Sequence, residues 1–354
     1  MAYATITKPS LHFNTKLYEG NGSSPRSITG VGFQPDWTWT KNRDNTNGHG
    51  LFDAVRGYTT GKGLSTHNAN AQGNADAYGY LSSRDSDGYT MTAGGSGMTM
   101  NNTNGESYVS WNWKANGAGS SNSDGDVTST VSVNSTAGIS IVKWTNSGNA
   151  GWVGHGLGTI PHWILIKNLG SGSSITAWVN YHHKIDSSSP EDYTIYTNST
   201  DARSDNPVFN DTAPTSTKFR FDSGDTTDYI AYCFAEKKGY SKFGSYTGNG
   251  NADGTFVYTG FKPAFLIIKR TDIAKNWYMH DIKRDGYNND NPYLSPNLNA
   301  AETGGTELDL YSNGFKMRSN GTGHNQSGGT YIYMAFAEEP LVANVGNSIP
   351  ATAR

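Results

Sequence analysis

Three sequence blocks recur in the same order along the 354-residue chain, and this repetition constrains the fold more than any other feature. Each copy opens with a short strand-like run that ends in an Asn- and Gly-rich turn. A Gly-x-x-Pro block follows, with β-branched or aromatic residues after the proline and a lysine near its end. A tyrosine-led block closes each copy. The blocks lie at 17–22, 32–42 and 108–114, at 142–148, 158–168 and 229–235, and at 244–250, 260–270 and 331–337.

The spacing between these blocks is nearly constant. The closing tyrosine follows Pro35 by 73 residues, and it follows Pro161 and Pro263 by 68 residues each. Self-similarity at a fixed spacing is typical of a chain built from repeated structural units. The sequence therefore predicts one domain present in three tandem copies.

The closing blocks alternate with the period of a β-strand. Large side chains such as Trp111, Trp113 and Phe234 occupy every second position, which predicts an apolar inner face. The opposite positions in the second and third copies hold small residues such as Ala231 and Ala335. Small residues there indicate that another element packs closely over that face.

We expect an all-β protein of three tandem β-sandwich domains, of jelly-roll or concanavalin A-like type, because strand-like runs recur with turn signals between them. Gly, Ser and Asn dominate the segment between the first and second copies, which indicates a flexible linker. Both ends of the chain are expected to be extended arms. The predicted divisions are an arm at 1–15, repeats at 16–115, 140–237 and 242–339, a linker at 116–139 and a tail at 340–354.

Composition argues against several classes of partner. The net charge of −3 offers no basic excess for phosphate backbones, so nucleic-acid binding is not expected. The first ten residues lack the apolar core of a secretory signal, and no apolar run approaches ~20 residues. We therefore expect a chain that is made in a host cytoplasm and is not inserted into a membrane. Its single cysteine, Cys233, excludes an internal disulfide and is expected to be a buried apolar residue.

The acidic residues do not predict catalysis. Glycosidases need two carboxylates across a cleft, and no such pair stands out on one strand. Asp53 and Asp281 each precede an arginine by three residues, which favours a turn with a local ion pair. Glu236 and Glu338 are expected at solvated strand ends. The prediction is that the chain is not an enzyme, has no catalytic residues and needs no cofactor.

Metal binding is not expected either. His182 and His183 are adjacent, so on a strand they point to opposite faces and make a poor chelating pair. The segment 84–89 resembles the front of a calcium loop but lacks its later glutamate. A plain Asp-Gly turn before a strand is the favoured interpretation.

Aromatic side chains beside amides suit carbohydrate, because rings stack on sugar faces and amides bond hydroxyls. Trp152, Trp178 and Trp277 are the candidates for a glycan-binding surface. Trp178 and Trp277 occupy comparable places in two copies. For this pair, burial in the core is the alternative interpretation.

Several phrases of the chain resemble a family of repeat proteins from marine bacteriophages. They are the runs at 8–18, 29–37, 239–250 and 330–338 and the ending at 349–354. The resemblance covers nearly the whole chain. It implies a virion or tail-associated protein with a concanavalin-like sandwich, and it supplies no catalytic residues to transfer.

Three functional hypotheses follow. The first is a non-catalytic virion structural protein, either a tail fibre or host-contacting appendage with glycan binding, or a capsid decoration or head-fibre protein. The second is a particle-borne glycan hydrolase, and the third is a free lectin-like module. The expected partners are other virion proteins of the tail or capsid and a host surface glycan. A homo-oligomer is expected, with a trimer favoured, although the chain lacks the heptad and collagen repeats typical of fibres.

Overall fold

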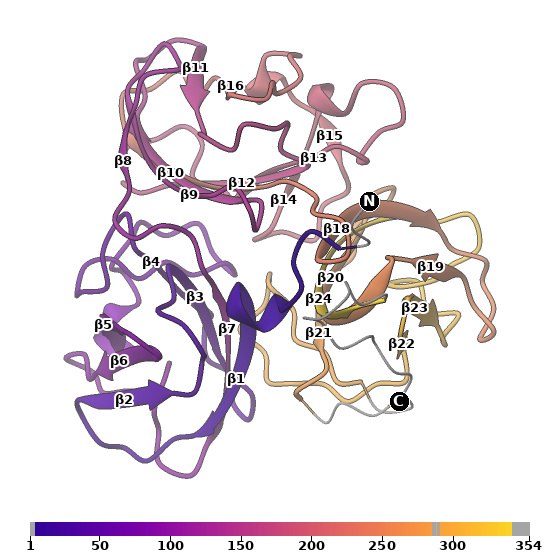
Figure 1. The fold of residues 1–354 in the computed structure, drawn as a ribbon, viewed down its shortest axis with the longest axis horizontal. Coiled ribbons are helices and arrows are strands. Elements are labelled where there is room, and N and C mark those ends of the chain that lie inside the picture. The colour runs from indigo at the N-terminus through magenta and orange to yellow at the C-terminus, as the bar shows by residue number, and fades with distance from the viewer. Residues whose placement is uncertain (1–3, 285–287, 289–290, 342–354) are drawn as a thin grey trace.

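The computed structural model describes residues 4–284, 288 and 291–341, and these residues form an all-β structure (Figure 1). Helical structure in this part of the chain is limited to short 3₁₀ turns. These are η1 (Pro9–Leu11), η2 (Asp76–Tyr78), η3 (Pro190–Asp192) and η4 (Pro207–Phe209). The predicted all-β class is confirmed. The strands fall into three groups along the chain, which we call group 1 (residues 13–113), group 2 (120–234) and group 3 (241–340).

Group 1 contains a four-stranded and a three-stranded antiparallel sheet. The larger sheet has the order β1 (Phe13–Glu19), β7 (Ser107–Trp113), β3 (Trp37–Asn42), β4 (Gly50–Asp53). The smaller sheet has the order β2 (Arg26–Thr29), β6 (Gly88–Thr92), β5 (Tyr80–Asp85).

Group 2 contains an eight-stranded sheet and a two-stranded sheet. The larger has the order β15 (Ser204–Asp205), β14 (Tyr193–Tyr196), β13 (Val179–His182), β12 (Trp163–Asn168), β17 (Asp228–Phe234), β10 (Ile139–Thr145), β9 (Ser129–Asn134), β8 (Ser120–Asn122). The smaller pairs β11 (Gly151–Gly154) with β16 (Lys218–Phe221).

Group 3 returns to the pattern of group 1. Its larger sheet has the order β18 (Ser241–Thr247), β24 (Thr330–Pro340), β20 (Phe261–Arg270), β21 (Trp277–Asp281). Its smaller sheet has the order β19 (Phe256–Tyr258), β23 (Gly314–Met317), β22 (Leu308–Tyr311).

The same strand order occurs in all three groups. In each larger sheet the opening strand pairs with the closing strand, which pairs with the Gly-x-x-Pro strand and then with its hairpin partner. The register agrees as well, since the pairs Trp37–Trp113, Trp163–Phe234 and Phe265–Phe336 are equivalent. The sequence blocks therefore mark equivalent strands.

The large side chains of the closing strands meet in one core that the three groups share. Figure 1 shows the groups around a common centre, with the larger sheets toward it. Trp37 of group 1 stacks on Tyr232 of group 2, with ring centroids 4.4 Å apart. Phe336 of group 3 lies 5.8 Å from both Trp113 and Phe234. The apolar face predicted to line each repeat's own interior lies instead at the junction of all three groups.

The opposite face of the closing strand packs on the smaller sheet. In group 2, Ala231 and Cys233 share a buried cluster with Val153 of β11 and with Phe219 and Phe221 of β16. The expectation that another element packs closely over these small residues is confirmed. Each smaller sheet therefore lies on the side of its larger sheet that faces away from the common centre.

Two segments outside the predicted repeats are more ordered than composition indicated. The segment 116–139, interpreted as a linker, contains β8 and β9, which extend the larger sheet of group 2. Its Ser, Thr and Val residues supply the backbone hydrogen bonds and the inward side chains of a strand. Within the expected N-terminal arm, Ile6 is buried in the shared core, and the Thr5 N–H donates to the Lys238 carbonyl at 2.9 Å. Residues 342–354 of the expected tail lie outside the described residues.

Candidate functional site

Two of the three tryptophans predicted to bind glycan are core residues. The side chains of Trp178 and Trp277 are 0% and 1% exposed. Their indole N–H groups donate to backbone carbonyls of the preceding group, at 2.8 Å to Ser65 and 3.0 Å to Tyr196. Neither ring has an open face on which a sugar can stack. For this pair the alternative interpretation, core packing, is correct.

These two tryptophans belong to a repeated set of contacts between groups. His49 occupies the same position in group 1, four residues before the last residue of the hairpin strand. Its Nδ1 accepts a hydrogen bond from the Trp39 indole at 2.8 Å, so Nε2 carries the proton and donates to the Ser295 carbonyl at 3.0 Å. Group 2 thus contacts group 1, group 3 contacts group 2, and group 1 contacts group 3, each from the same equivalent position.

A second set of contacts runs in the opposite direction. Asp53, His182 and Asp281 occupy equivalent positions. In the strand register they pair with the equivalent core residues Trp37, Trp163 and Phe265. Asp53 accepts a hydrogen bond from the Tyr232 hydroxyl at 2.8 Å, and Asp281 accepts one from the Trp111 indole at 2.9 Å.

The third contact of this set uses different chemistry. The residue of group 3 equivalent to Trp111 and Tyr232 is Met334, which has no donor to offer a carboxylate. His182 is the matching change in group 2, and its Nε2 donates to the Tyr333 carbonyl at 3.2 Å. The two sets together close a ring of groups 1, 2 and 3.

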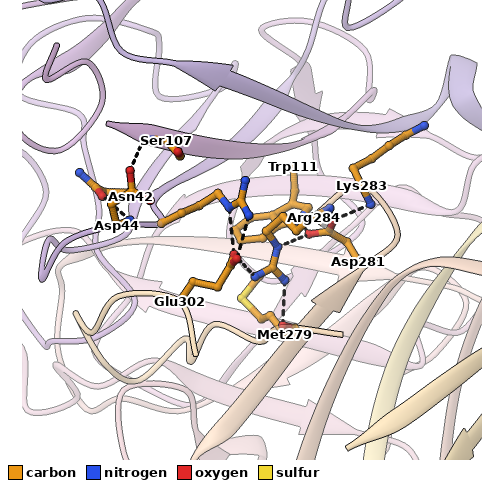
Figure 2. Close-up of polar contacts among 10 residues, drawn as sticks. Asn42, Asp44, Ser107, Trp111, Met279, Asp281, Lys283, Arg284 and Glu302 are labelled. Carbon is orange, nitrogen blue, oxygen red and sulfur yellow. Dashed lines mark hydrogen bonds and ion pairs between the residues drawn. The ribbon is translucent and has the colours of Figure 1, made fainter. Parts of the chain in front are cut away.

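The boundary between groups 3 and 1 carries a buried network of charges (Figure 2). Asp281 pairs with Arg284 at 2.7 Å, and both side chains are fully buried. Arg284 also pairs with Glu302 at 2.8 Å, and Glu302 pairs with Arg43 of group 1 at 2.8 Å. The Arg284 guanidinium lies 5.7 Å from the centre of the Trp111 ring. Both carboxylates are neutralised by guanidinium groups, as suits a structural junction.

Asp53 and Arg56 form the same ion pair in group 1, at 2.5 Å. Asp53 also caps its own turn, since it accepts the backbone N–H groups of Val55 and Arg56. The turn with a local ion pair that the sequence favoured at Asp53 and Asp281 is confirmed.

The lysine near the end of each Gly-x-x-Pro strand is buried. Lys41, Lys167 and Lys269 are 0% exposed and bond to backbone carbonyls. Lys167 reaches Ala69 of group 1 at 3.2 Å, and Lys269 reaches Thr200 of group 2 at 3.1 Å. Burial lowers the pKa of Lys41 and Lys269 to about 7 and that of Lys167 to about 8.

The remaining sequence candidates take structural places. His182 and His183 contact different carbonyls, and Glu338 pairs with Lys262 at 2.7 Å. The Glu236 carboxylate accepts the Phe243 backbone N–H at 2.9 Å. Residues 86 and 87 form the turn between β5 and β6, as predicted. Among the described residues, no group of three or more His, Cys, Asp or Glu side chains is arranged to hold a metal. No helix in the same part of the chain is long and apolar enough to cross a membrane.

Trp152 is the predicted glycan residue that remains accessible. It lies on β11 and points away from the buried cluster to which Val153 belongs. It is half-buried beside two basic side chains of β16, with Lys218 Nζ 5.1 Å and Arg220 Cζ 5.5 Å from its ring centre. Sequence reasoning identified the ring but not the cations, because they are 66 and 68 residues further along the chain.

Group 3 presents a related aromatic face that the sequence search missed. Phe256 and Tyr258 of β19 occupy the outward positions and are 45% and 55% exposed. Phe256 is equivalent to Trp152, since both flank the buried valine of the outer strand. The alternation Phe256, Val257, Tyr258 is the signal that could have located this face.

Comparisons with known proteins add a family but no activity. No curated protein matches the chain, and no solved structure matches it. The model of a family described as a domain of unknown function, DUF7483, matches residues 8–340. That span runs from the first turn η1 to the last residue of β24, so it includes all three strand groups. The chain therefore belongs to the DUF7483 family.

Proposed function

We propose that this chain is a non-catalytic structural protein of a bacteriophage particle that contacts the host surface, as a tail fibre or a similar appendage. In this proposal each strand group is one β-sandwich of jelly-roll or concanavalin A-like type, and the three are fused into a single ring. The chain assembles in the host cytoplasm and acts as part of the virion. Its partners are neighbouring virion proteins and a glycan of the host surface.

The observation that carries the structural role is the closed ring of contacts. Trp178, Trp277 and His49 join the groups in one direction, and Asp53, His182 and Asp281 join them in the other. Contacts of both directions resist rotation of any one group against its neighbours. Such a body suits a part that must transmit or withstand force without changing shape.

The outward aromatic residues support the contact with a host. Trp152 in group 2 and Phe256 and Tyr258 in group 3 lie on smaller sheets, on the side away from the common centre. Aromatic rings on an accessible face suit the apolar faces of sugar rings. The phage setting itself rests on the resemblance of the sequence phrases to marine bacteriophage repeat proteins.

A place on the capsid is the second candidate, and the approximate threefold arrangement of the strand groups favours it. Icosahedral shells present threefold axes, and one chain with three equivalent groups can match such an axis. The sequence favoured a homotrimer. The apolar strand faces that we would expect at a trimer interface are used inside this chain, so a trimer of chains needs other surfaces.

Purified particles of a phage that encodes the chain provide the test. Mass spectrometry of gradient-purified virions is expected to detect the chain in a fixed ratio to the major capsid protein. Immunogold electron microscopy with antibodies against the chain is expected to label the tail or its fibres. Label on the shell supports the capsid alternative, and absence of the chain from intact particles overturns both.

A further inference from the structure

The outward face of β11 and β16 combines one aromatic ring with two positive charges. Trp152 lies directly across from Arg220 in the register of the two strands. Lys218 is on the same side of β16, because residues two apart on a strand share a face. Among the described residues, neither cation has a carboxylate within ion-pair distance.

The equivalent positions of groups 1 and 3 show that the scaffold does not require these charges. In group 3, Phe256 lies across from Lys316, and Asp253 forms an ion pair with that lysine. In group 1, the pair is Ser27 and Thr90, whose hydroxyls lie 2.8 Å apart. Group 2 is therefore the copy in which an aromatic ring and unpaired cations coincide.

Arg220 has an unmet hydrogen-bonding need. Its Nε is buried and has no acceptor among the described residues. Guanidinium groups match the planar fork of a carboxylate, and a buried donor without an acceptor is unfavourable. Arg220 as a whole is half-buried, so an incoming carboxylate can pair with the accessible part of its guanidinium while Lys218 adds a second charge.

The other edge of β11 offers acceptors instead of donors. Val127 bridges to Val153 on that edge, and the Asp126 carboxylate accepts the Trp152 backbone N–H at 2.9 Å. Asp124 and Asp126 are both exposed. Carboxylates there can accept hydrogen bonds from hydroxyl groups. The face thus has cations on one side of the ring and hydroxyl acceptors on the other.

We propose that Trp152, Lys218 and Arg220 form a binding site for a uronic acid residue of an acidic polysaccharide. The sugar ring stacks on the indole, its carboxylate pairs with Arg220 and Lys218, and its hydroxyls face Asp126 and Asp124. This inference rests on the proposed host-contacting function and names the class of glycan that the surface takes.

Fluorescence reports on this site selectively. The chain has nine tryptophans, and the other eight are buried. The anionic quencher iodide is expected to quench Trp152 more strongly than the cation caesium, because two positive charges flank the ring. Addition of a galacturonic acid hexamer is expected to protect the ring from iodide. Equal quenching by both ions, or no protection by the hexamer, contradicts the inference.

Matched ligands and variants separate stacking from charge. The fully methyl-esterified hexamer keeps the sugar rings but removes the negative charges, and it is expected to bind about tenfold more weakly or worse. Trp152→Ala and the double variant Lys218→Ala/Arg220→Ala are each expected to weaken binding of the free acid by about tenfold. Lys316→Ala, at the equivalent position of group 3, is the control and should bind like the unaltered chain. Unfolding curves verify that each variant is folded.

The outcome can be read apart from the proposed function. If particles contain the chain but the unaltered chain does not bind the galacturonic acid hexamer in calorimetry, this inference is wrong and the structural role stands. If the hexamer binds but particles lack the chain, the binding site stands and the structural role is wrong. Binding that Trp152→Ala and Lys316→Ala weaken equally is attraction to general surface charge, and it also overturns the site.

Discussion

The carboxylate of Asp281 accepts a hydrogen bond from the indole of Trp111 at 2.9 Å across 170 residues of chain. Both residues are buried, and the contact joins the last strand group to the first. Arg284 and Glu302 extend it to Arg43, so that the non-covalent junction of groups 3 and 1 carries the largest charged network described between groups. The two ends of the repeated architecture are held here without help from the chain's covalent connections.

Asp281→Ala is expected to lower the free energy of unfolding by about 3–5 kcal/mol, because it leaves Arg284 buried with reduced compensation and removes the acceptor of Trp111. Urea unfolding followed by circular dichroism measures this loss. The control is Asp228→Ala, whose partner Lys143 lies at the surface 3.0 Å away. An exposed ion pair of this kind is worth less than about 1 kcal/mol.

The double variant Asp281→Leu/Arg284→Met sharpens the interpretation. It removes the ion pair as a whole, and Glu302 keeps its contact with Arg43. We expect it to be more stable than Asp281→Ala alone. A double variant that is less stable than Asp281→Ala would show that the ion pair stabilises the fold beyond the neutralisation of its two charges.

Trp178→Ala and Trp152→Ala should differ sharply in stability. Truncation of the fully buried Trp178 removes core contacts and leaves the Ser65 carbonyl unpaired, at a cost of about 3–5 kcal/mol. Trp152 loses mainly its contacts with two cations, at a cost of about 1 kcal/mol or less. Parallel unfolding curves test the difference, and equal losses would contradict the placement of the two rings.

These two tryptophans also show where sequence reasoning reached its limit. The repeated blocks predicted which strands are equivalent, and the alternation of Trp111 and Trp113 predicted one apolar face. Alternation identifies two faces but not what covers each one. Trp178 is covered through Ser65, 113 residues away, and Trp277 through Tyr196, 81 residues away. Nothing local distinguishes such a ring from an exposed one.

The buried lysines illustrate the same limit. The sequence showed a lysine near the end of every Gly-x-x-Pro strand, but lysine is seldom fully buried in proteins. Lys167 is buried because Ala69 of another group supplies a carbonyl for its ammonium group. Only the arrangement of the groups around their centre brings that carbonyl within reach.

Acid is expected to destabilise the fold through its buried histidines. Burial lowers the pKa of all nine histidines, to about 4 for His155 and His183 and to about 3 for His324. The unfolded chain protonates its histidines near pH 6.5, whereas the folded chain does not. Unfolding therefore takes up protons below that pH, and the free energy of unfolding falls as the pH drops from about 7 toward 4.

Melting temperatures measured between pH 7.5 and 4.5 test this expectation. His183→Gln removes one of these histidines, so unfolding of the variant takes up about one proton fewer. Its melting temperature should therefore fall less steeply as the pH drops. A melting temperature that stays constant over this range would mean that the histidines are protonated in the folded protein.

Alkaline conditions are expected to stabilise the fold through the buried lysines. In the folded chain the pKa values of Lys41, Lys167 and Lys269 lie at about 7 to 8, below the ordinary value near 10.5. The unfolded chain therefore binds more protons between pH 8 and 10, and stability is expected to rise with pH in that window. Urea unfolding at pH 8.0 and 9.5 measures the rise. Lys167→Met should show a smaller rise, and an unchanged slope in this variant would exclude Lys167 as a contributor.

Light scattering is expected to give the mass of one chain in solution. The large apolar faces of β7, β17 and β24 are covered by one another, so little apolar strand surface remains to drive association. A stable trimer, which the sequence favoured, would show that the arms or the outward sheets carry a further interface.

The order in which a ribosome releases the chain gives the shared core a further consequence. Trp111 and Trp113 are complete early, but their cover from Phe265 and Phe336 is made more than 150 residues later. Until then, the indole rings of Trp111 and Trp113 lack this cover and are exposed to water. A product that stops after group 2 leaves these rings uncovered, so premature termination is expected to yield aggregates rather than a smaller stable protein.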